Sequence, residues 1–364
     1  MNLAETVYAG FRPMMSNIQS PLNIDLLPVI PVDTYMIYSA PDIALRFNMN
    51  QFITFFDNQF IAIWTQGTNE GNSGNHIVCS TSPDGITWAP VQDVTPVAET
   101  GWTEGSAGLW EREGELWALY RHAEVGTRPE GPTYYGPSLA LRGNRWNGSG
   151  WDQYQVICDN CHLDLQPIKL RTGKWYATGR DKHFRTQMIL GDIGDWTRII
   201  VPSPEGVLLN EATILPIGDG SILSYEYRNE MDMNPRVLLR SFSTNDGGTI
   251  SPPLPTNFRD AAGRRAVMRL SDGRYILSSN ASVPWGRRKL MLSVSDDGLT
   301  YNRMYILRGE ETHPKWGWEP PDPPLHREGY QYPQFLERDG YLWVIYSRNK
   351  EDIEISRVEL SAFE

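Results

Sequence analysis

The stretch "LNEATILPIGDGSILSYEYRNE" (residues 209–230) decides the fold, because two β-prone runs flank a Gly-Asp-Gly turn. Glycine supplies the backbone conformations that tight turns need, and the aromatic and branched residues after the turn favour an extended strand. Glu211 precedes the turn and Arg228 follows it. The stretch therefore predicts a β-hairpin with Glu211 at one end and Arg228 at the other.

The same pattern of a strand, a turn of charged residues and glycine, and an aromatic strand occurs six times along the chain. The units are "FFDNQFIAIWTQG" (55–67), "WEREGELWALYRHA" (110–123), "KLRTGKWYATGRD" (169–181), "LPIGDGSILSYEYRN" (215–229), "RLSDGRYILSSNA" (269–281) and "LERDGYLWVIYSRN" (336–349). Their spacing of roughly 50 to 65 residues is typical of four-stranded propeller blades. Long helical periodicity is absent, so the sequence predicts an all-β fold, a six-bladed β-propeller of four-stranded antiparallel blades.

A second repeated element follows some of these hairpins. It reads "CSTSPDGITWAP" at 79–90, "SVSDDGLTYNRM" at 293–304 and, in degenerate form, "SFSTNDGGTISPP" at 241–253. Serine and aspartate can bond to the turn backbone, and glycine adopts the left-handed conformation. We interpret these Asp boxes as parts of the fold rather than as catalytic groups.

The last repeat is one strand short of a complete blade, since only "EDIEISRVEL" follows it. A strand from the N-terminal region, "VDTYMIYSA" (32–40), is predicted to pair there and close the ring, which would remove an exposed sheet edge. We therefore expect residues 1–364 to form one propeller domain, with residues 1–40 as an N-terminal extension and closing strand.

Composition excludes several classes of protein. The chain has 364 residues, 40% of them hydrophobic, which is too apolar for a disordered protein. The formal net charge of -11 and scattered basic residues argue against a nucleic-acid partner. No stretch has the composition of a membrane span, and the N-terminus lacks the pattern of a signal peptide. We expect a soluble, cytoplasmic protein without a membrane partner.

The sequence "CDNCH" (158–162) fits the C-x-x-C-H pattern of covalent haem attachment. The flanking residues are strand-like and offer no helical partner for a haem, so packed thiols or a local disulfide are the favoured interpretation. Only Cys79 is left over, which excludes a site of four thiolates. We expect neither a cofactor nor a metal.

The Asp boxes together with "NEAT…DGSILSYEYR" resemble the sialidase (neuraminidase) superfamily of six-bladed β-propellers. The resemblance spans roughly residues 40–360. It implies an exo-acting glycoside hydrolase whose partner is a glycan or oligosaccharide that contains an acidic sugar. In that family three arginines from separate blades clamp the substrate carboxylate, and a tyrosine, activated by a glutamate, is the nucleophile.

The resemblance assigns the arginine clamp residue by residue. Arg46, in "IALRFNMNQFITFF", stands where the family has Arg-Ile-Pro, although the Ile-Pro is missing here. Arg228 is the second member. The third is Arg288 or its neighbour Arg287, in "SNASVPWGRRKLMLSVSDDG". A guanidinium suits this role because its planar fork donates two parallel hydrogen bonds to a carboxylate.

Glu211 corresponds to the family's glutamate partner of the nucleophile. A phenol with an ordinary pKa near ~10 needs an adjacent carboxylate to accept its proton. The nucleophile itself is expected in "EGYQYPQF", at Tyr330 or Tyr332, with a slight preference for Tyr330.

The acid/base residue corresponds least well to the family. The family uses an aspartate in the loop after the first hairpin, but "TQGTNEGNSGNHIV" (65–78) contains none. Glu70 falls at about that position, and His76 in the same loop is its competitor, since an imidazole titrates near neutral pH.

Two further residues are candidates for substrate binding. His162 and Asp164 lie at the start of the third hairpin, where propeller inner strands begin and where a channel mouth would be, although packing or capping explains either one alone. Arg121 and His122 occupy the equivalent place in the second unit.

Two other functions stay open. One is a polysaccharide lyase or rhamnosidase-like enzyme acting at a uronic acid, with His76, His122 or His162 as acid or base. The other is a propeller that binds glycans without catalysis. The fold alone does not decide among them, since propellers serve many functions.

Overall fold

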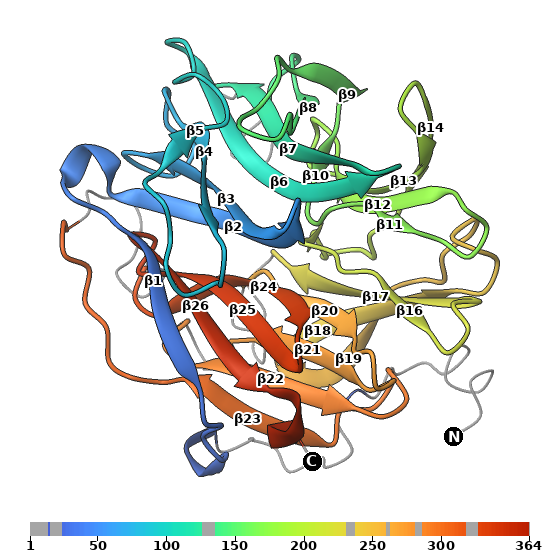
Figure 1. Cartoon of the computed structure of the whole chain (residues 1–364). Coiled ribbons are helices and arrows are strands. Elements are labelled where there is room, and N and C mark those ends of the chain that lie inside the picture. Colours follow the sequence, from blue (N-terminus) through green and yellow to red (C-terminus); the bar gives the residue numbers. More distant parts are fainter. Residues whose placement is uncertain are drawn as a thin grey trace.

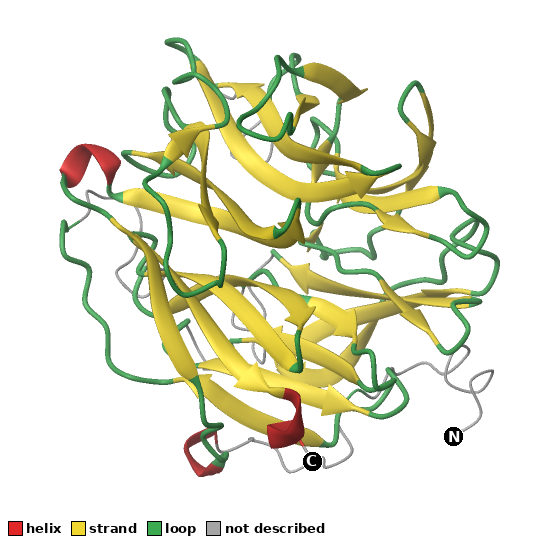
Figure 2. Ribbon diagram, viewed as in Figure 1, coloured by secondary structure: helices red, strands yellow, loops and turns green. Residues whose placement is uncertain are grey.

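The computed structural model describes Met14 and residues 24–125, 135–230, 237–259, 263–280, 286–317 and 327–363. Apart from Met14, the predicted N-terminal extension up to residue 23 lies outside these residues. The described residues form six antiparallel sheets arranged as the blades of a ring, and the predicted all-β propeller is confirmed (Figure 1). Helical structure among them consists of short 3-10 segments, as Figure 2 shows.

The first three blades follow one another along the chain. Blade one contains β2 (Phe47–Phe56), β3 (Gln59–Gly67), β4 (His76–Ser82) and β5 (Gln92–Asp93). Blade two contains β6 (Trp102–Arg112), β7 (Glu115–Glu124), β8 (Ala140–Arg145) and β9 (Gln155–Asp159). Blade three contains β10 (His162–Leu163), β11 (Ile168–Lys169), β12 (Trp175–Arg180), β13 (Thr186–Asp192) and β14 (Asp195–Ile200), with β10 and β11 both paired to β12.

The remaining blades complete the ring. Blade four contains β15 (Leu209–Asn210), β16 (Leu215–Ile217), β17 (Ile222–Asn229), β18 (Val237–Ser243) and β19 (Leu254–Arg259). Blade five contains β20 (Val267–Arg269), β21 (Tyr275–Ser279), β22 (Leu290–Ser295) and β23 (Arg303–Arg308). Blade six contains β24 (Tyr330–Arg338), β25 (Tyr341–Arg348), β26 (Asp352–Glu359) and, paired with β26, the N-terminal strand β1 (Asp33–Ser39). The 3-10 helices are η1 (Ile24–Leu26), η2 (Ile43–Leu45) and η4 (Leu360–Phe363).

In blades one, two and six the charged turn of the repeat is a two-residue hairpin loop. In blade one, Asp57 and Asn58 both have positive φ, at 50° and 64°, between β2 and β3. Asp339 and Gly340 do the same between β24 and β25, at 52° and 79°. Positive φ at both central positions matches the twist of the flanking strands, and Asp, Asn and Gly tolerate it best. Turn chemistry at these positions therefore fixes the register of these hairpins.

The Asp boxes are confirmed as parts of the fold. In blade one, the Oδ1 atom of Asp84 accepts hydrogen bonds from the backbone nitrogens of Ile86 and Thr87, both at 2.8 Å. Gly85 has a φ of 74°, and a Cβ atom there would lie 2.8 Å from the ring of Trp343 in blade six. Only glycine satisfies both the conformation and the space.

The hydrophobic core lies between neighbouring blades rather than in one central mass. Ile63 and Leu109, for example, pack in one cluster between blades one and two, and Leu292 packs with Val344 between blades five and six. This sheet-to-sheet packing leaves the inner ends of the blades free to carry polar side chains around the axis. These inner ends form the candidate site.

Candidate active site

A cavity of about 530 Å³ lies at the inner ends of the blades. Every blade contributes to its lining, together with the segment that precedes β20. Its charged side chains are Arg121, Arg180, Arg228, Arg264, Arg287, Lys350, Glu70, Glu104, Glu211 and Glu230. The concentration of cations in an acidic chain suits an anionic ligand.

Tyr332 and Glu211 are in direct contact within this cavity. The hydroxyl of Tyr332 donates a hydrogen bond of 2.5 Å to the Oε1 atom of Glu211. Both residues line the cavity, and they are 7% and 3% exposed. A tyrosine with a carboxylate at its hydroxyl has the arrangement of an activated nucleophile.

The environment fixes the charge states of this pair. Burial would raise the pKa of Glu211, but the positive charges of Arg228, Arg264 and Arg180 outweigh it and hold that pKa well below its ordinary value of 4.5. Burial, and then the charge of Glu211, raise the pKa of Tyr332. The resting pair is therefore a neutral phenol beside a carboxylate that can accept its proton.

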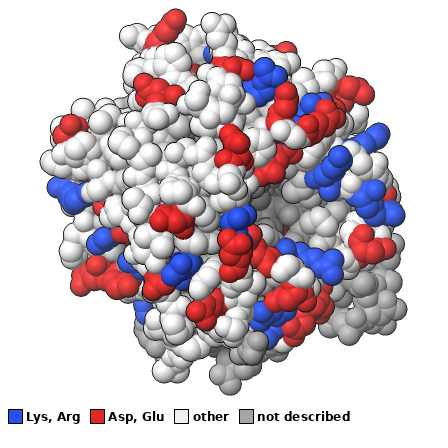
Figure 3. Space-filling model, in the orientation of Figure 1, with Lys and Arg blue, Asp and Glu red and all other residues white. Residues whose placement is uncertain are grey.

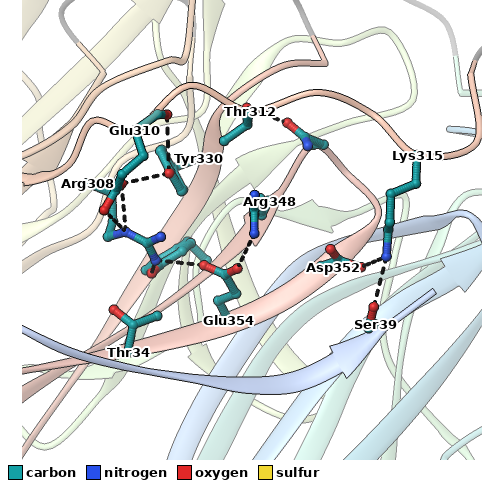
Figure 4. Close-up of polar contacts among 12 residues, drawn as sticks. Thr34, Ser39, Arg308, Glu310, Thr312, Lys315, Tyr330, Arg348, Asp352 and Glu354 are labelled. Atoms are coloured by element: carbon teal, nitrogen blue, oxygen red, sulfur yellow. Dashed lines mark hydrogen bonds and ion pairs between the residues drawn. The ribbon is translucent and has the colours of Figure 1, made fainter.

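The sequence-based preference for Tyr330 as the nucleophile is not supported, because Tyr330 contacts Glu310 rather than Glu211. The hydroxyl of Tyr330 donates to the Oε2 atom of Glu310 at 2.8 Å, in a network with Arg308 and Glu354 (Figure 4). Tyr330 does not belong to the cavity lining, whereas Tyr332 does. The contact with Glu211 thus falls to Tyr332.

Arg228 lies where the sequence places it, but its guanidinium is shared between two carboxylates. Nη1 is 2.8 Å from Glu211 and Nη2 is 2.9 Å from Glu230. The residue lines the cavity and is mostly buried. Its observed contacts orient Glu211.

The two adjacent arginines of blade five have different positions. Arg287 lines the cavity, with its guanidinium carbon 5.1 Å from the centre of the Tyr332 ring. Arg288 forms an ion pair with Glu328 at 2.9 Å, and its side chain is 56% exposed. Of the two candidates, Arg287 is therefore the one positioned for a ligand.

Arg46 lies outside the cavity lining, which differs from the clamp that the resemblance implies. Its Nε and Nη1 atoms donate to the backbone carbonyls of Thr68 and Gly317, at 3.1 and 2.9 Å. Its Nη2 atom donates to the Oδ1 atom of Asn69 at 3.0 Å. These contacts make Arg46 a brace between two loops.

Glu70 lines the cavity as expected for an acid/base group at its mouth, and its side chain is 48% exposed. The Nζ atom of Lys350 donates to it at 2.6 Å. The charge of Lys350 is the main cause that lowers the pKa of Glu70 below 4.5. Glu70 thus rests as a carboxylate paired with a buried ammonium.

His76, the competitor of Glu70, is not part of the cavity lining. Its ring contacts Asp93, with Nε2 and Oδ1 separated by 3.5 Å. The carboxylate that blade two does bring to the cavity is Glu104, 6% exposed, whose Oε1 atom lies 3.2 Å from Nδ1 of His122. This pair makes Glu104 a second candidate for proton transfer.

Asp164 and His162 have different positions. Asp164 is fully buried behind the lining and forms an ion pair of 2.9 Å with Arg180. His162 lines the cavity, and burial together with the charges of Arg180, Arg121 and Arg264 lowers its pKa well below 6.5. His162 is therefore a neutral imidazole, and Asp164 positions an arginine.

Sequence reasoning missed Arg264 and Lys350 and did not single out Glu104. Arg264 belongs to the doublet of arginines before β20, and Lys350 follows the aromatic strand β25. Each position lies close to one end of a strand, which is the signal that could have identified them. Neither residue belongs to a recognisable motif.

Cys158 and Cys161 are free and buried. They pack in the cluster between blades two and three, which agrees with packed thiols rather than a bonded pair.

Among the described residues, no cluster of His, Cys, Asp and Glu has the arrangement of a metal site. Within the same residues, no helix has the length and apolarity needed to span a membrane. On the face shown in Figure 3, acidic and basic side chains are interspersed.

The fold and the cavity together define a six-bladed propeller with a cationic central site that contains a tyrosine and a glutamate in contact. The chain belongs to the BNR repeat-like domain family, whose model matches residues 58–344. No curated protein sequence matches the chain.

Solved structures share this fold. The Hadza microbial sialidase Hz136 has a TM-score of 0.70 at 16% identity, over 91% of this chain and 69% of its own. A protein of unknown function from Dyadobacter fermentans also has a TM-score of 0.70, at 14% identity over 92% and 100%. The intramolecular trans-sialidase from Ruminococcus gnavus has a TM-score of 0.66 at 14% identity, over 90% and 97%. The chain therefore shares its propeller fold with these structures.

Proposed function

We propose that the protein is an exo-acting glycoside hydrolase that removes a terminal acidic sugar, a sialic or related ulosonic acid, with retention of configuration. The observation that carries this proposal is the 2.5 Å contact between Tyr332 and Glu211 in a cavity lined by cations. The sialidase-like neighbours support the same class of activity.

In the first step, the Tyr332 oxygen attacks the anomeric carbon while its proton passes to Glu211. The bond to the leaving-group oxygen breaks, and that oxygen takes a proton from an acid, a role that we assign to the protonated form of Glu70. In the second step, water attacks the anomeric carbon and gives a proton to the Glu70 carboxylate, while the tyrosine oxygen leaves and regains its proton from Glu211.

The choice of tyrosine as nucleophile fits the charge of the substrate. A neutral phenol approaches an anomeric centre that bears a carboxylate without the repulsion that a carboxylate nucleophile would meet. Arg287, beside the ring of Tyr332, supplies positive charge where the phenol oxygen becomes negative in the transition state.

The test is a screen of 4-methylumbelliferyl α-sialoside, other 4-methylumbelliferyl acidic glycosides and uronate-containing oligosaccharides. We expect turnover of an acidic glycoside that is lost in Glu211→Gln and Tyr332→Phe. Proton NMR of the first product should show the retained anomer. Unchanged turnover in both variants would contradict the mechanism.

The lyase alternative rests on His162, a neutral base that lines the cavity. The same screen separates it, because elimination at a uronic acid gives an unsaturated product that absorbs ultraviolet light. Binding without any turnover would instead indicate a glycan-binding propeller.

A further inference from the structure

Arg264 is a buried cation without a hydrogen-bond partner among the residues that the structure describes. Its side chain lines the cavity and is 3% exposed, and the Nε and Nη1 atoms are enclosed without acceptors. Burying a charge is costly unless an opposite charge or hydrogen bonds compensate it. A folded protein retains such a group where a ligand supplies the missing partner.

The position of Arg264 places it at the reacting groups. Its guanidinium carbon lies 4.9 Å from the centre of the Tyr332 ring. Its charge acts on Glu211, together with the charges of Arg228 and Arg180. An anion bound to Arg264 would therefore lie close to the Tyr332 ring and the Glu211 carboxylate.

The neighbouring residue, Arg265, shows the opposite behaviour. Its Nη1 atom donates to the backbone carbonyl of Gly263 at 3.1 Å, and its Nη2 atom donates to the carbonyls of Glu211 and Glu226 at 2.9 and 3.2 Å. Arg265 is 1% exposed and lies outside the cavity lining. The doublet thus divides into one arginine that holds the backbone of Glu211 and one that faces the cavity.

Arg46 does not supply the charge that the family resemblance assigns to it. Backbone carbonyls and Asn69 accept its donors, and the residue is not part of the lining. Lys350 lines the cavity, but its ammonium pairs with Glu70 at 2.6 Å. Neither Arg46 nor Lys350 is therefore positioned to bind an incoming carboxylate.

We propose that Arg264 is the principal anchor of the substrate carboxylate, in the place that the resemblance gives to Arg46. The proposal rests on the proposed function and extends it, because it states which residue gives the site its preference for an acidic sugar. The guanidinium would donate hydrogen bonds to the carboxylate oxygens and hold the anomeric carbon next to Tyr332.

Binding measurements test this assignment directly. The probes are 2-deoxy-2,3-didehydro-N-acetylneuraminic acid, its methyl ester and inorganic sulfate, measured by calorimetry on the full chain. We expect wild type to bind the acid at least about tenfold more tightly than the neutral ester, since hydrogen bonds to charged groups are the strong ones. Arg264→Gln should lose this preference, and Arg46→Gln should keep it.

Thermal stability separates a ligand-binding role of Arg264 from a merely structural one. Arg264→Gln removes a buried guanidinium whose Nε and Nη1 atoms have no acceptor and whose charge is only partly offset by Glu211, so the ligand-free variant should unfold at about the same temperature as wild type. Arg265→Gln removes three hydrogen bonds to the backbone and should unfold at a lower temperature. A large loss of stability in Arg264→Gln would overturn the proposal.

The remaining outcomes also decide. The proposal is wrong if Arg264→Gln keeps the acid-over-ester preference, or if wild type binds none of the three probes. If wild type binds only sulfate, loss of that binding in Arg264→Gln still supports an anion site at this residue, and its persistence refutes one. Anion binding that depends on Arg264, without turnover of any acidic glycoside, would reject the proposed hydrolase activity alone.

Discussion

Glu211 and Tyr332 are 121 positions apart in the chain, yet their side chains meet at 2.5 Å, and both have left-handed backbone conformations. Their φ angles are 47° and 55°. Such a conformation costs roughly 1–3 kcal/mol for a residue with a side chain and persists only where surrounding contacts enforce it.

Those contacts are visible on both sides. Asn210 accepts a hydrogen bond from the backbone nitrogen of Glu211 at 2.8 Å, and Arg265 donates to the carbonyl of Glu211. Gln51 donates to the carbonyls of Gln331 and Tyr332, at 2.9 and 2.5 Å. The fold thus maintains two strained positions that aim a phenol and a carboxylate at one another.

Replacing Tyr332 by Phe should remove the nucleophile and leave the fold intact. We expect turnover of an acidic glycoside to fall by about 10²–10⁴-fold, the range for loss of a positioned catalytic group. The matched control is Tyr330→Phe, which loses only a hydrogen bond to Glu310 outside the cavity. The measurement is the initial rate of each variant, with circular dichroism as the check on folding. Equal losses of activity in the two variants would contradict the assignment of Tyr332 as the nucleophile.

Glu211 should make stability depend on pH at the acidic end. Its folded pKa is lower than its ordinary 4.5, so its ionised form stabilises the folded state above that value, and the contribution declines as the pH falls from 4.5 toward the folded pKa. The difference in unfolding free energy between wild type and Glu211→Gln should therefore be constant near neutral pH and shrink below 4.5. Urea titrations at several pH values measure it.

The control for this pH series is Glu205→Gln, at an exposed position. Its unfolding free energy should follow that of wild type at each pH. A Glu211→Gln difference that stays constant down to pH 3 would show that the cationic surroundings do not favour the carboxylate.

Glu70→Gln should lower kcat/KM more for substrates with poor leaving groups than for substrates with good ones. A general acid matters most where the departing oxygen holds a proton strongly, and 4-methylumbelliferone leaves without much help. We expect the loss of kcat/KM to be at least about tenfold larger on an acidic sugar linked to galactose than on the aryl glycoside. Glu104→Gln is the comparison, and the larger leaving-group dependence there would transfer the role to Glu104.

Lys350 should set the upper pH limit of activity through Glu70. The positive charge of Lys350 lowers the pKa of Glu70, and the acid role requires the protonated form. Lys350→Gln should therefore raise that pKa and shift the alkaline limb of the kcat/KM profile to higher pH. A profile whose alkaline limb stays in place, or moves to lower pH, would exclude Glu70 as the acid.

The blade repeat was predictable because it rests on local chemistry. Turn residues such as Asp57 and Asn58 select a two-residue hairpin, and Asp84 with Gly85 closes an Asp box, whatever the rest of the chain does. The position of Glu211 next to a blade-four hairpin followed from the same local pattern.

The choice between Tyr330 and Tyr332 was not predictable from alternation. Residues that are two positions apart in a regular strand share one face, so alternation alone places both tyrosines on the same side of the sheet. The irregular register of β24 between Gln331 and Gln334, together with the positive φ of Tyr332, separates them. One hydroxyl then contacts Glu310 and the other contacts Glu211.

The arginines separate what the sequence determines from what only the tertiary structure determines. The sequence by itself determined an all-β ring of repeated hairpins and the presence of many arginines near strand ends, because turns, strands and Asp boxes depend on neighbouring residues. Only the tertiary structure decided that Arg46 donates to backbone carbonyls, that Arg288 faces solvent, and that Arg264 faces the cavity. Whether a buried guanidinium is satisfied or available depends on acceptors that come from other blades, which no local pattern encodes.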